Sequence, residues 1–505
     1  MTLSSLAVMA RNVLRSNAGS DALQYRDRWY TWGDLGRLAE EVERLIVASG
    51  AGQRAPMALI GRNRPETVAA LTGLIARDRT VRMIYAYQSA QSTIAEIDRL
   101  NPAVIIGMAE DLPDEVLTAM ERSGRVVVSL AGMGATATPG TDRVRTDVPD
   151  TTGAPAVEVL TSGTTGPPKS FPLPFDTIAR HMVGKNIRPE ELVVPDDATP
   201  PVLLYLPMGN ISGIYTIVPT IVSGQRGMLL DRFDLQAWRD YIVRFRPQFA
   251  SVIPAAVHMI VEANLPVDDL ASLKSLSAGA AAVDPSIQAA FERRYGIPLL
   301  SSYGATEFCG PVAAMTLGDR MAFGDSVATS VGRPLPGSHI RVVDPDTGSE
   351  LPRGEQGLIE VMTERIGKHW IRTSDLGAID ANGFVFHRGR NDGAIMRGGF
   401  KILPERIERA LMTHDAVACV AVTGIKDTRL GEVPAALIQI KAGRAQPDPD
   451  ELEATVRRQL PSTHVPAVWK FVPEMPRTPS HKVDRRAVRA LFAEQEADTE
   501  SRHLA

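Results

Sequence analysis

A short segment rich in hydroxyls and glycines directly follows the apolar run 156–160 and could bind phosphate. It reads Thr161-Ser-Gly-Thr-Thr-Gly-Pro-Pro-Lys-Ser170. Backbone N–H groups, hydroxyls and one cation on such a loop can hold phosphate oxygens. A Walker loop needs glycine immediately before its lysine, whereas Pro168 precedes Lys169 here. The segment therefore indicates a phosphate-binding loop of another type, with a flexible surface turn as the alternative explanation.

Four further segments combine glycines with charged and hydroxyl side chains. They are Ser302-Tyr-Gly-Ala-Thr-Glu307, Trp370-Ile-Arg-Thr-Ser-Asp-Leu-Gly377, Gly389-Arg-Asn-Asp392 followed by Arg397-Gly-Gly-Phe-Lys-Ile402, and Pro476-Arg-Thr-Pro-Ser-His-Lys-Val-Asp484. With the loop at 161–170, they resemble in content and order the motifs of the adenylate-forming superfamily. This superfamily includes acyl-CoA synthetases, peptide-synthetase adenylation domains and luciferases. The resemblance covers essentially the whole chain and is strongest to acyl-CoA synthetases, although Ser374 and His481 stand where the family usually has glycine.

The chemistry implied by this resemblance accounts for the residue types. A substrate carboxylate can itself attack the α-phosphate of ATP, so the protein needs no nucleophile of its own. It must align the reactants and neutralise charge while pyrophosphate departs. The resemblance implies ATP, Mg²⁺ and coenzyme A as cofactors and co-substrates.

The same resemblance gives the motif residues expected roles. Lys482 would contact the α-phosphate and carboxylate oxygens, where negative charge gathers in the transition state. Thr306 would contact phosphate, and Glu307 would hold Mg²⁺, a cation that prefers oxygen ligands. The residues expected to bind ATP and AMP are Thr161, Ser162, Gly163, Thr164, Thr165, Lys169, Gly279, Ala280, Ala281, Ser302, Tyr303, Gly304, Asp375 and Arg390.

Two of these residues have specific expected partners on the nucleotide. Tyr303 would stack on adenine, with 279–281 lining the other side. Asp375 would accept hydrogen bonds from the ribose hydroxyls, and Arg390 would support that contact. Taken singly, each such residue is more typical of a turn or a solvated surface, so these roles depend on the ordered set of motifs.

The segment expected to line the acyl pocket departs from the family pattern. It reads Pro207-Met-Gly-Asn-Ile-Ser-Gly213, with Gly209 in place of the usual aromatic residue and Asn210 in place of histidine. We expect Met208, Gly209, Asn210 and Ile211 to line the pocket. The upstream stretch 77–87 departs as well. Small residues at Gly209 and at 278–282 predict a roomy pocket. Neither 207–213 nor 278–282 contains Lys or Arg, which favours a hydrophobic acid as substrate.

Apolar runs alternating with amphipathic stretches between about 55 and 360 predict an α/β fold. We expect a large N-terminal domain of layered, mostly parallel sheets with helices at 1–390. A small, mobile α+β C-terminal domain is expected at 391–505. Its predicted elements are helices at Pro404–Met412 and Glu451–Leu460 and strands at Val417–Val422, Ala435–Ile440 and Val468–Val472. By the resemblance, Asp392 would be the hinge, and Gly398 and Gly399 would line the path of the coenzyme A thiol.

Composition narrows the class of protein. The net charge of −4 provides no basic excess for nucleic acid. Two cysteines in 505 residues do not form a disulfide framework, which favours a reducing compartment such as the cytoplasm. No stretch approaches the length of about 18 apolar residues needed for a membrane span. The sequence leaves the oligomeric state open, a homodimer included.

The sequence therefore predicts an AMP-forming acid–thiol ligase. The predicted reaction makes an acyl-AMP from a fatty, aryl or polycyclic acid and transfers the acyl group to coenzyme A. Transfer to the phosphopantetheine of a carrier protein is the first alternative, because both acceptors end in the same thiol arm. An inactive ligand-binding relative is the second alternative.

Overall fold

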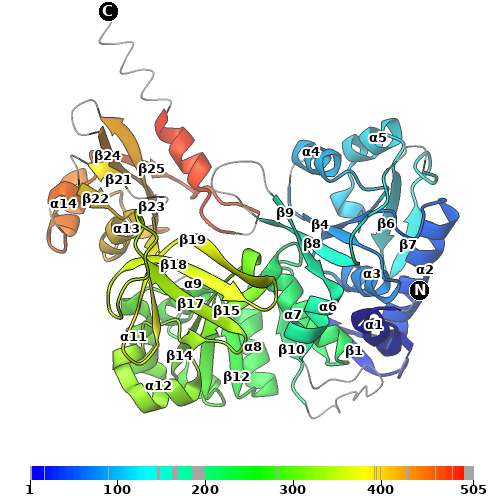
Figure 1. Cartoon of the computed structure of the whole chain (residues 1–505), viewed down its shortest axis with the longest axis horizontal. Helices are drawn as coiled ribbons and strands as arrows, with labels where there is room; N and C mark the ends of the chain where they lie inside the picture. The colour runs from blue at the N-terminus through cyan, green and yellow to red at the C-terminus, as the bar shows by residue number, and fades with distance from the viewer. Residues whose placement is uncertain are drawn as a thin grey trace, which may run out of the picture. The chain divides into compact units, whose positions relative to one another are not determined.

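The computed structural model describes most of the chain between residues 3 and 493. The described residues are 3–15, 17–88, 90–144, 148–161, 169–184, 199–279, 283–391, 393, 395–397, 400–427, 431–460, 462–479 and 481–493. The chain forms two compact units, Met1–Pro311 and Val312–Ala505. Figure 1 colours the first from blue to green and the second from green to red.

The largest sheet of unit Met1–Pro311 has seven strands in the order β7-β6-β5-β3-β4-β8-β9. They are β3 (Met57–Gly61), β4 (Val81–Tyr85), β5 (Val104–Met108), β6 (Val126–Ala131), β7 (Gly134–Ala137), β8 (Ala156–Thr161) and β9 (Lys169–Pro174). The inner strands, from β6 to β8, run parallel. Every residue of β3 and β5 is buried, as expected for parallel strands with helices on both faces. This confirms the predicted α/β class.

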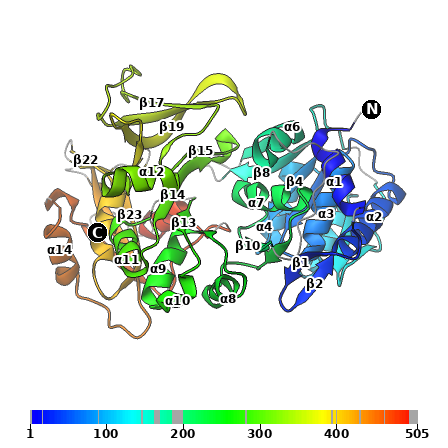
Figure 2. The same ribbon diagram turned by 90° about the horizontal axis from the view of Figure 1, so that it is seen from below.

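Helices pack on both faces of this sheet. On one face lie α1 (Ser5–Arg15), α2 (Trp32–Ala48) and α3 (Pro65–Ala76), and on the other α4 (Ala90–Leu100) and α5 (Asp114–Arg122) (Figures 1 and 2). Ile60 and Ile105 pack with α4 and α5, while the alternate strand residues face the other way. Neither α1 nor α2 was predicted from the sequence, although Thr31 and Asp34 form a capping box that begins α2.

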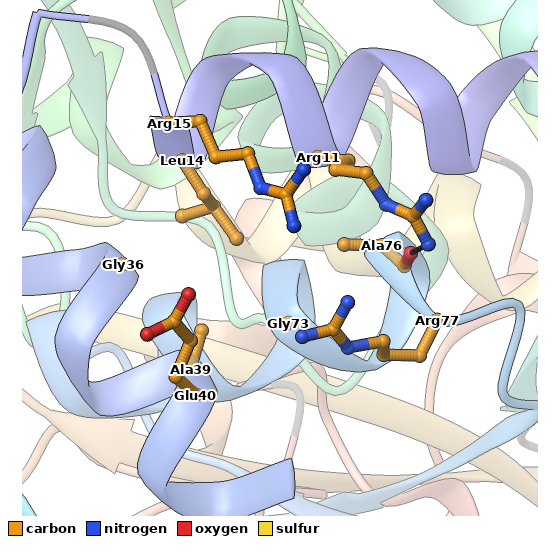
Figure 3. A pocket seen from close by; sticks show the side chains of 9 residues that line it. All are labelled: Arg11, Leu14, Arg15, Gly36, Ala39, Glu40, Gly73, Ala76 and Arg77. Atoms are coloured by element: carbon orange, nitrogen blue, oxygen red, sulfur yellow. Dashed lines mark hydrogen bonds between the residues drawn. The ribbon is translucent and has the colours of Figure 1, made fainter.

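A small hollow lies between α1, α2 and α3, with three arginines around small residues (Figure 3). Its lining consists of Arg11, Leu14, Arg15, Gly36, Ala39, Glu40, Gly73, Ala76 and Arg77. A Cβ at Gly73 would lie 2.7 Å from the Cβ of Ala39, so glycine allows α2 and α3 to pack closely. Arg11 Nη2 donates to the carbonyl of Ala76 at 3.3 Å, at the end of α3 where positive charge is favourable. Helix packing thus accounts for Arg11.

Two smaller sheets complete this unit. One has the order β10-β11-β1-β2 and consists of β1 (Asp21–Tyr25), β2 (Arg28–Thr31), β10 (Val202–Leu204) and β11 (Gly227–Leu229). The other contains the parallel strands β12 (Phe249–Val252), β13 (Ser275–Ala278) and β14 (Leu299–Ala305). Further α-helices are α6 (Phe175–Thr177), α7 (Ile211–Val222), α8 (Leu235–Phe245), α9 (Pro254–Glu262), α10 (Val267–Leu270) and α11 (Pro285–Tyr295). Trp238 and Phe291 are fully buried where α8, α9 and α11 pack on β13 and β14.

Unit Val312–Ala505 begins with antiparallel strands. β15 (Gly310–Ala314) pairs with β16 (Arg333–Pro334), and α12 (Leu317–Phe323) lies between them in the chain. An antiparallel sheet follows, made of β17 (Ser338–Val343), β18 (Gly357–Thr363), β19 (Gly367–Ile379) and β20 (Val385–Arg390). The expectation of parallel sheets up to about residue 360 therefore does not hold here. The turn Asp380–Phe384 that joins β19 and β20 is far shorter than the dozen or so residues that a parallel crossover needs.

The last part of the chain is a small α+β arrangement, as predicted. It contains β21 (Ile395–Arg397), β22 (Phe400–Ile402), α13 (Pro404–Met412), β23 (Val417–Asp427), β24 (Gly431–Ile440), α14 (Pro449–Arg457), β25 (Val468–Val472) and a helix at 485–493. The bounds of α13 and β25 agree with the prediction, while β23 extends further. Ile407 and Leu411, which share one helix face at i, i+4 spacing, are fully buried.

Throughout the part of the chain that the structure describes, no helix is both long and apolar enough to cross a membrane.

Candidate active site

The parallel strands β13 and β14 bring together several residues predicted to bind nucleotide. Gly279 directly follows β13, and Ser302 lies on β14 before the 3₁₀ turn Thr306–Phe308. A Cβ at Gly279 would lie 3.0 Å from Ser302 Oγ, so the two residues are neighbours. Ligands of open α/β sheets bind beyond the carboxyl ends of the strands. This edge can therefore hold a nucleotide; Ala280 and Ala281 lie outside the described residues.

Tyr303 and Gly304 show how β14 is packed at this edge. Tyr303 is 8% exposed, and its ring centroid lies 6.1 Å from that of Phe308. A Cβ at Gly304 would lie 2.5 Å from the carbonyl oxygen of Gly310. Glycine is therefore required here by the close approach of two backbones. Stacking of Tyr303 on adenine stays a prediction.

Thr306 and Glu307 occupy the 3₁₀ turn that follows β14. The Glu307 side chain is exposed, and its carboxylate is the type of hard oxygen ligand that suits Mg²⁺. The described residues contain no group of three His, Cys, Asp or Glu placed to hold a metal ion. Mg²⁺ commonly uses one or two carboxylates together with substrate phosphates, so Glu307 fits such a role. Cys309, at the end of the turn, is buried.

The predicted phosphate loop connects the two strands at one side of the seven-stranded sheet. Thr161 at the end of β8 is paired with Lys169 at the start of β9. The loop therefore leaves from the carboxyl end of a parallel strand, the edge where ligands bind in such sheets. Ser162, Gly163, Thr164 and Thr165 lie outside the described residues.

In unit Val312–Ala505, strands β19 and β20 position Asp375, the residue predicted to bind the ribose. Asp375 and Arg390 are register partners across this pair. The Asp375 carboxylate is 13% exposed, and its Oδ1 lies 3.5 Å from His387 Nε2. The backbone N–H of Asp375 donates to Thr373 Oγ1 at 3.0 Å. Sequence reasoning missed His387, because its place beside Asp375 depends on a register shift between the two strands.

Lys482 lies on an exposed loop that is held by hydrogen bonds between its own backbone groups. The backbone N–H of Thr478 donates to the carbonyl of Lys482 at 2.8 Å, and that of His481 to Thr478 at 2.8 Å. Just downstream, Arg485 donates to both carboxylate oxygens of Glu408 on α13, at 2.6 and 3.0 Å. It also donates to the carbonyl of Val422 on β23 at 2.9 Å. The loop that carries Lys482 is thus anchored to α13 and β23.

The predicted hinge and thiol-path residues, Asp392, Gly398 and Gly399, lie outside the described residues.

The predicted acyl-pocket segment follows β10 and begins α7. Met208 is fully buried, and Asn210 is the N-cap of α7, accepting a hydrogen bond from the Gly213 N–H at 2.9 Å. A Cβ at Gly209 would lie 2.9 Å from Tyr85 Cδ1. Tyr85 thus fills the space beside Gly209, so this glycine adds no room on that side, while a roomy pocket stays a prediction. Burial raises the pKa of the Tyr85 hydroxyl, and the nearby Glu96 carboxylate raises it further.

Two family models match this chain. The AMP-binding enzyme model matches residues 10–368, and the model of the AMP-binding enzyme C-terminal domain matches 406–482. The chain belongs to the AMP-binding enzyme family. This confirms the resemblance to adenylate-forming enzymes that the motifs indicated.

Individual relatives match between about two thirds and nearly all of the chain at modest identity. Indoleacetate–CoA ligase of Aromatoleum aromaticum is 28% identical over 94% of this chain and 96% of its own length. Fatty acid–[acyl-carrier-protein] ligase ScoC of Streptomyces coeruleorubidus is 29% identical over 68% of each chain. The solved structure of amide bond synthetase McbA from Marinactinospora thermotolerans has a TM-score of 0.74 and 25% identity, covering 96% of this chain and 99% of its own.

Two departures from the AMP-binding family motifs have different physical consequences. Ser374 lies in the strand β19, and its carbonyl accepts the N–H of Asn391 at 2.6 Å. Its φ is not positive, so the backbone there does not require glycine. His481 instead has φ of 59°, in the left-handed region where glycine is favoured. The family's glycine at this position is therefore explained by backbone conformation, and His481 adopts it under strain.

Replacing His481 by glycine should stabilise the protein. His481→Gly removes the steric cost of a left-handed conformation, about 1–2 kcal/mol, against a glycine entropy cost of about 0.5–1 kcal/mol. We expect the free energy of unfolding in urea to rise by up to about 1.5 kcal/mol. His339→Gly is the control, because His339 is exposed on the strand β17 and glycine there should destabilise. A loss of stability in His481→Gly equal to that control would contradict the strain.

The contact between Gly209 and Tyr85 predicts that the two positions are energetically coupled. Gly209→Ala should lower the free energy of unfolding by about 1–3 kcal/mol through overpacking. Adding Tyr85→Ala should recover part of this loss, so the double variant is more stable than additivity predicts. Gly153→Ala serves as control, because a Cβ there would meet nothing within 4 Å. Strict additivity of the two substitutions would show that Tyr85 does not fill this space.

Proposed function

We propose that this protein activates a hydrophobic carboxylic acid with ATP, giving acyl-AMP and pyrophosphate, and then transfers the acyl group to coenzyme A. The proposal rests on the gathering of Gly279, Ser302 and the Thr306–Phe308 turn at one sheet edge in a chain of the AMP-binding enzyme family. The full-length relative that acts on indoleacetate supports a CoA ligase.

In the first half-reaction, a carboxylate oxygen attacks the α-phosphorus of ATP, and the bond to the departing pyrophosphate breaks. Lys482 contributes positive charge at the α-phosphate, and Thr306 donates to phosphate oxygen. Such preorganised contacts act where charge develops. Mg²⁺ held by Glu307 would supply charge neutralisation to the phosphates.

Nucleotide orientation would come from several of the residues described above. Asp375 accepts hydrogen bonds from the ribose hydroxyls, and His387 Nε2, 3.5 Å from its carboxylate, helps to hold it. Arg390, the register partner of Asp375, supports the same contact. Tyr303 stacks on adenine beside 279–281.

In the second half-reaction, the thiol loses its proton and its sulfur attacks the acyl carbon, while the bond to AMP breaks. We place the domain boundary between 390 and 391, with Asp392 as the hinge. The thiol arm would approach beside Gly398 and Gly399, where the absence of side chains leaves room for it. The small domain at 391–505 would turn between the half-reactions, because Lys482 and the thiol must reach the same centre in succession.

The acid is proposed to be apolar, with aryl acids included. Met208 is fully buried, and Tyr85 narrows the space beside Gly209. Met208, Gly209, Asn210 and Ile211 are proposed to contact the acyl group.

Two relatives support acceptors of the acyl group other than coenzyme A, and one experiment distinguishes the three possibilities. The relative ScoC acts on an acyl carrier protein, and McbA is an amide bond synthetase. Pyrophosphate release is first measured across aryl, fatty and polycyclic acids. Product formation is then measured with coenzyme A, a phosphopantetheinylated carrier protein or an amine. Formation of a thioester with coenzyme A supports the proposal. Formation of an acyl-carrier or amide product instead would show that the acceptor is a carrier protein or an amine. Absence of pyrophosphate release with every acid would indicate an inactive relative.

Lys482→Ala should reduce acid-dependent pyrophosphate exchange by about 10²–10³-fold, because one electrostatic contact to the reacting phosphate is lost. Transfer from supplied acyl-AMP should stay near the wild-type rate. Arg486→Ala, which removes an exposed cation four residues along the chain, is the control and should leave exchange intact. Wild-type exchange in Lys482→Ala would exclude the proposed role.

The two-position model predicts that the half-reactions can be separated. Asp392→Pro should fix φ at about −65° and restrict the hinge. Gly399→Leu should obstruct the thiol path. Both variants should lose thioester formation far more than pyrophosphate exchange, with the two half-reactions measured separately. Equal losses in both half-reactions for both variants would rule the model out.

A further inference from the structure

Asn63 is a buried amide at the carboxyl end of the middle strand of the seven-stranded sheet. Its Nδ2 donates to the carbonyls of Leu206 at 3.2 Å and Leu230 at 3.1 Å. Its Oδ1 accepts from the N–H of Met208 at 3.1 Å. The residue is 2% exposed. One side chain thus binds three backbone groups that lie more than a hundred residues further along the chain.

These three backbone groups belong to the segments that follow two neighbouring strands. Leu206 and Met208 come after β10, and Leu230 directly follows its parallel neighbour β11. An amide carries donors and an acceptor on one rigid group, so asparagine can serve two carbonyls and one N–H at once. A buried backbone group left without a partner costs about 1–3 kcal/mol. The path of 206–208 therefore depends on Asn63.

The residues on either side of Asn63 hold its backbone in place. Arg62 donates to Asp111, which follows β5, through Nε at 2.7 Å and also through Nη2. Arg64 forms an ion pair with Asp231, next to Leu230. Asn63 is therefore supported by charged pairs to two other strand ends.

The backbone of β3 also packs closely against the predicted acyl-pocket segment, 208–211. A Cβ at Gly61 would lie 2.9 Å from the backbone nitrogen of Gly209, so no side chain separates β3 from the segment. Asn210 then caps α7, which lies beside β10 in Figures 1 and 2. A shift at Met208 would move Gly209, Asn210 and the start of α7 together.

We propose that Asn63 is a positioning residue that sets the shape of the acid-binding pocket by fixing the backbone of 206–208. This inference rests on the proposed function, because it takes Met208–Ile211 as pocket residues. Asn63 does not touch ATP in this scheme. Its loss should therefore change how acids bind and which acids are preferred, while the use of ATP is retained.

The test is Asn63→Asp, which keeps the acceptor for Met208 but turns an oxygen toward the carbonyls of Leu206 and Leu230. We expect kcat/KM for the best acid to fall by about 10²-fold, as for a misplacement of about 1 Å. The KM for ATP should stay unchanged, and the ranking of acids of graded size should change. Burial among carbonyl oxygens raises the pKa of such a carboxyl group, and its protonated form can donate again. The variant should therefore regain activity relative to wild type as pH falls from about 8 to about 6.

Tyr241→Phe is the matched control. It removes another hydrogen bond from a buried side chain to backbone, Tyr241 Oη to Pro201 at 2.8 Å, which does not involve 206–208. It should leave acid preference and the KM for ATP at wild-type values. If Asn63→Asp does not fold, as judged by its thermal unfolding, Asn63→Ser is measured in the same way.

The outcomes separate this inference from the proposed function. A folded Asn63 variant with wild-type acid preference and wild-type KM for the acid overturns the positioning role, while the ligase proposal stands. An equal fall in kcat/KM for the acid and for ATP also overturns the positioning role. If the wild-type protein releases no pyrophosphate with any acid, the proposed function itself fails.

Discussion

Parallel strands end at the same edge of their sheet, and this constraint organises the unit Met1–Pro311. Gly279 and Ser302 meet because β13 and β14 run side by side in the same direction. The loop after β8, Asn63 after β3 and Tyr85 at the end of β4 likewise share the carboxyl edge of the seven-stranded sheet. Segments that leave such edges lack ladder partners for their backbone groups, so side chains must provide them. Asn63 does so for two segments of the neighbouring sheet at once.

The sequence predicted the features that depend on local pattern. The buried runs of β3 and β5 and the spacing of Ile407 and Leu411 are visible along the chain. The contacts of Asn63 were not predictable, because they join residues 143 to 167 positions apart. The periodicity of apolar residues along the sequence does not indicate which distant carbonyl groups a buried amide will bind. His387 was missed for a similar reason, since a register shift decides which β20 side chain lies beside Asp375.

Departures from a family pattern acquire meaning only when their surroundings are known. Gly209 alone suggested empty space, but the ring of Tyr85 occupies it, and Tyr85 itself lies in the other divergent segment, 77–87. The two divergent segments therefore meet at the contact between Gly209 and Tyr85. His481 is a different case, because its φ of 59° lies in the left-handed region that favours glycine. Side-chain packing governs the first site, and backbone conformation governs the second.

The anchoring of the Lys482 loop constrains how this lysine could reach a substrate. The paired hydrogen bonds from Arg485 to Glu408 tie the loop to α13, so Lys482 moves with α13 and β23 rather than independently. Its delivery in the proposed mechanism therefore requires 391–505 to move as one body. Leu403, just before α13, packs against Val343, Leu358 and Leu376 of the β17–β20 sheet. Exposing this leucine alone would cost about 1.5–3 kcal/mol, so any movement of 391–505 must offset at least that. The proposed role of Lys482 thus depends both on the anchoring of its loop and on movement of the body that carries it.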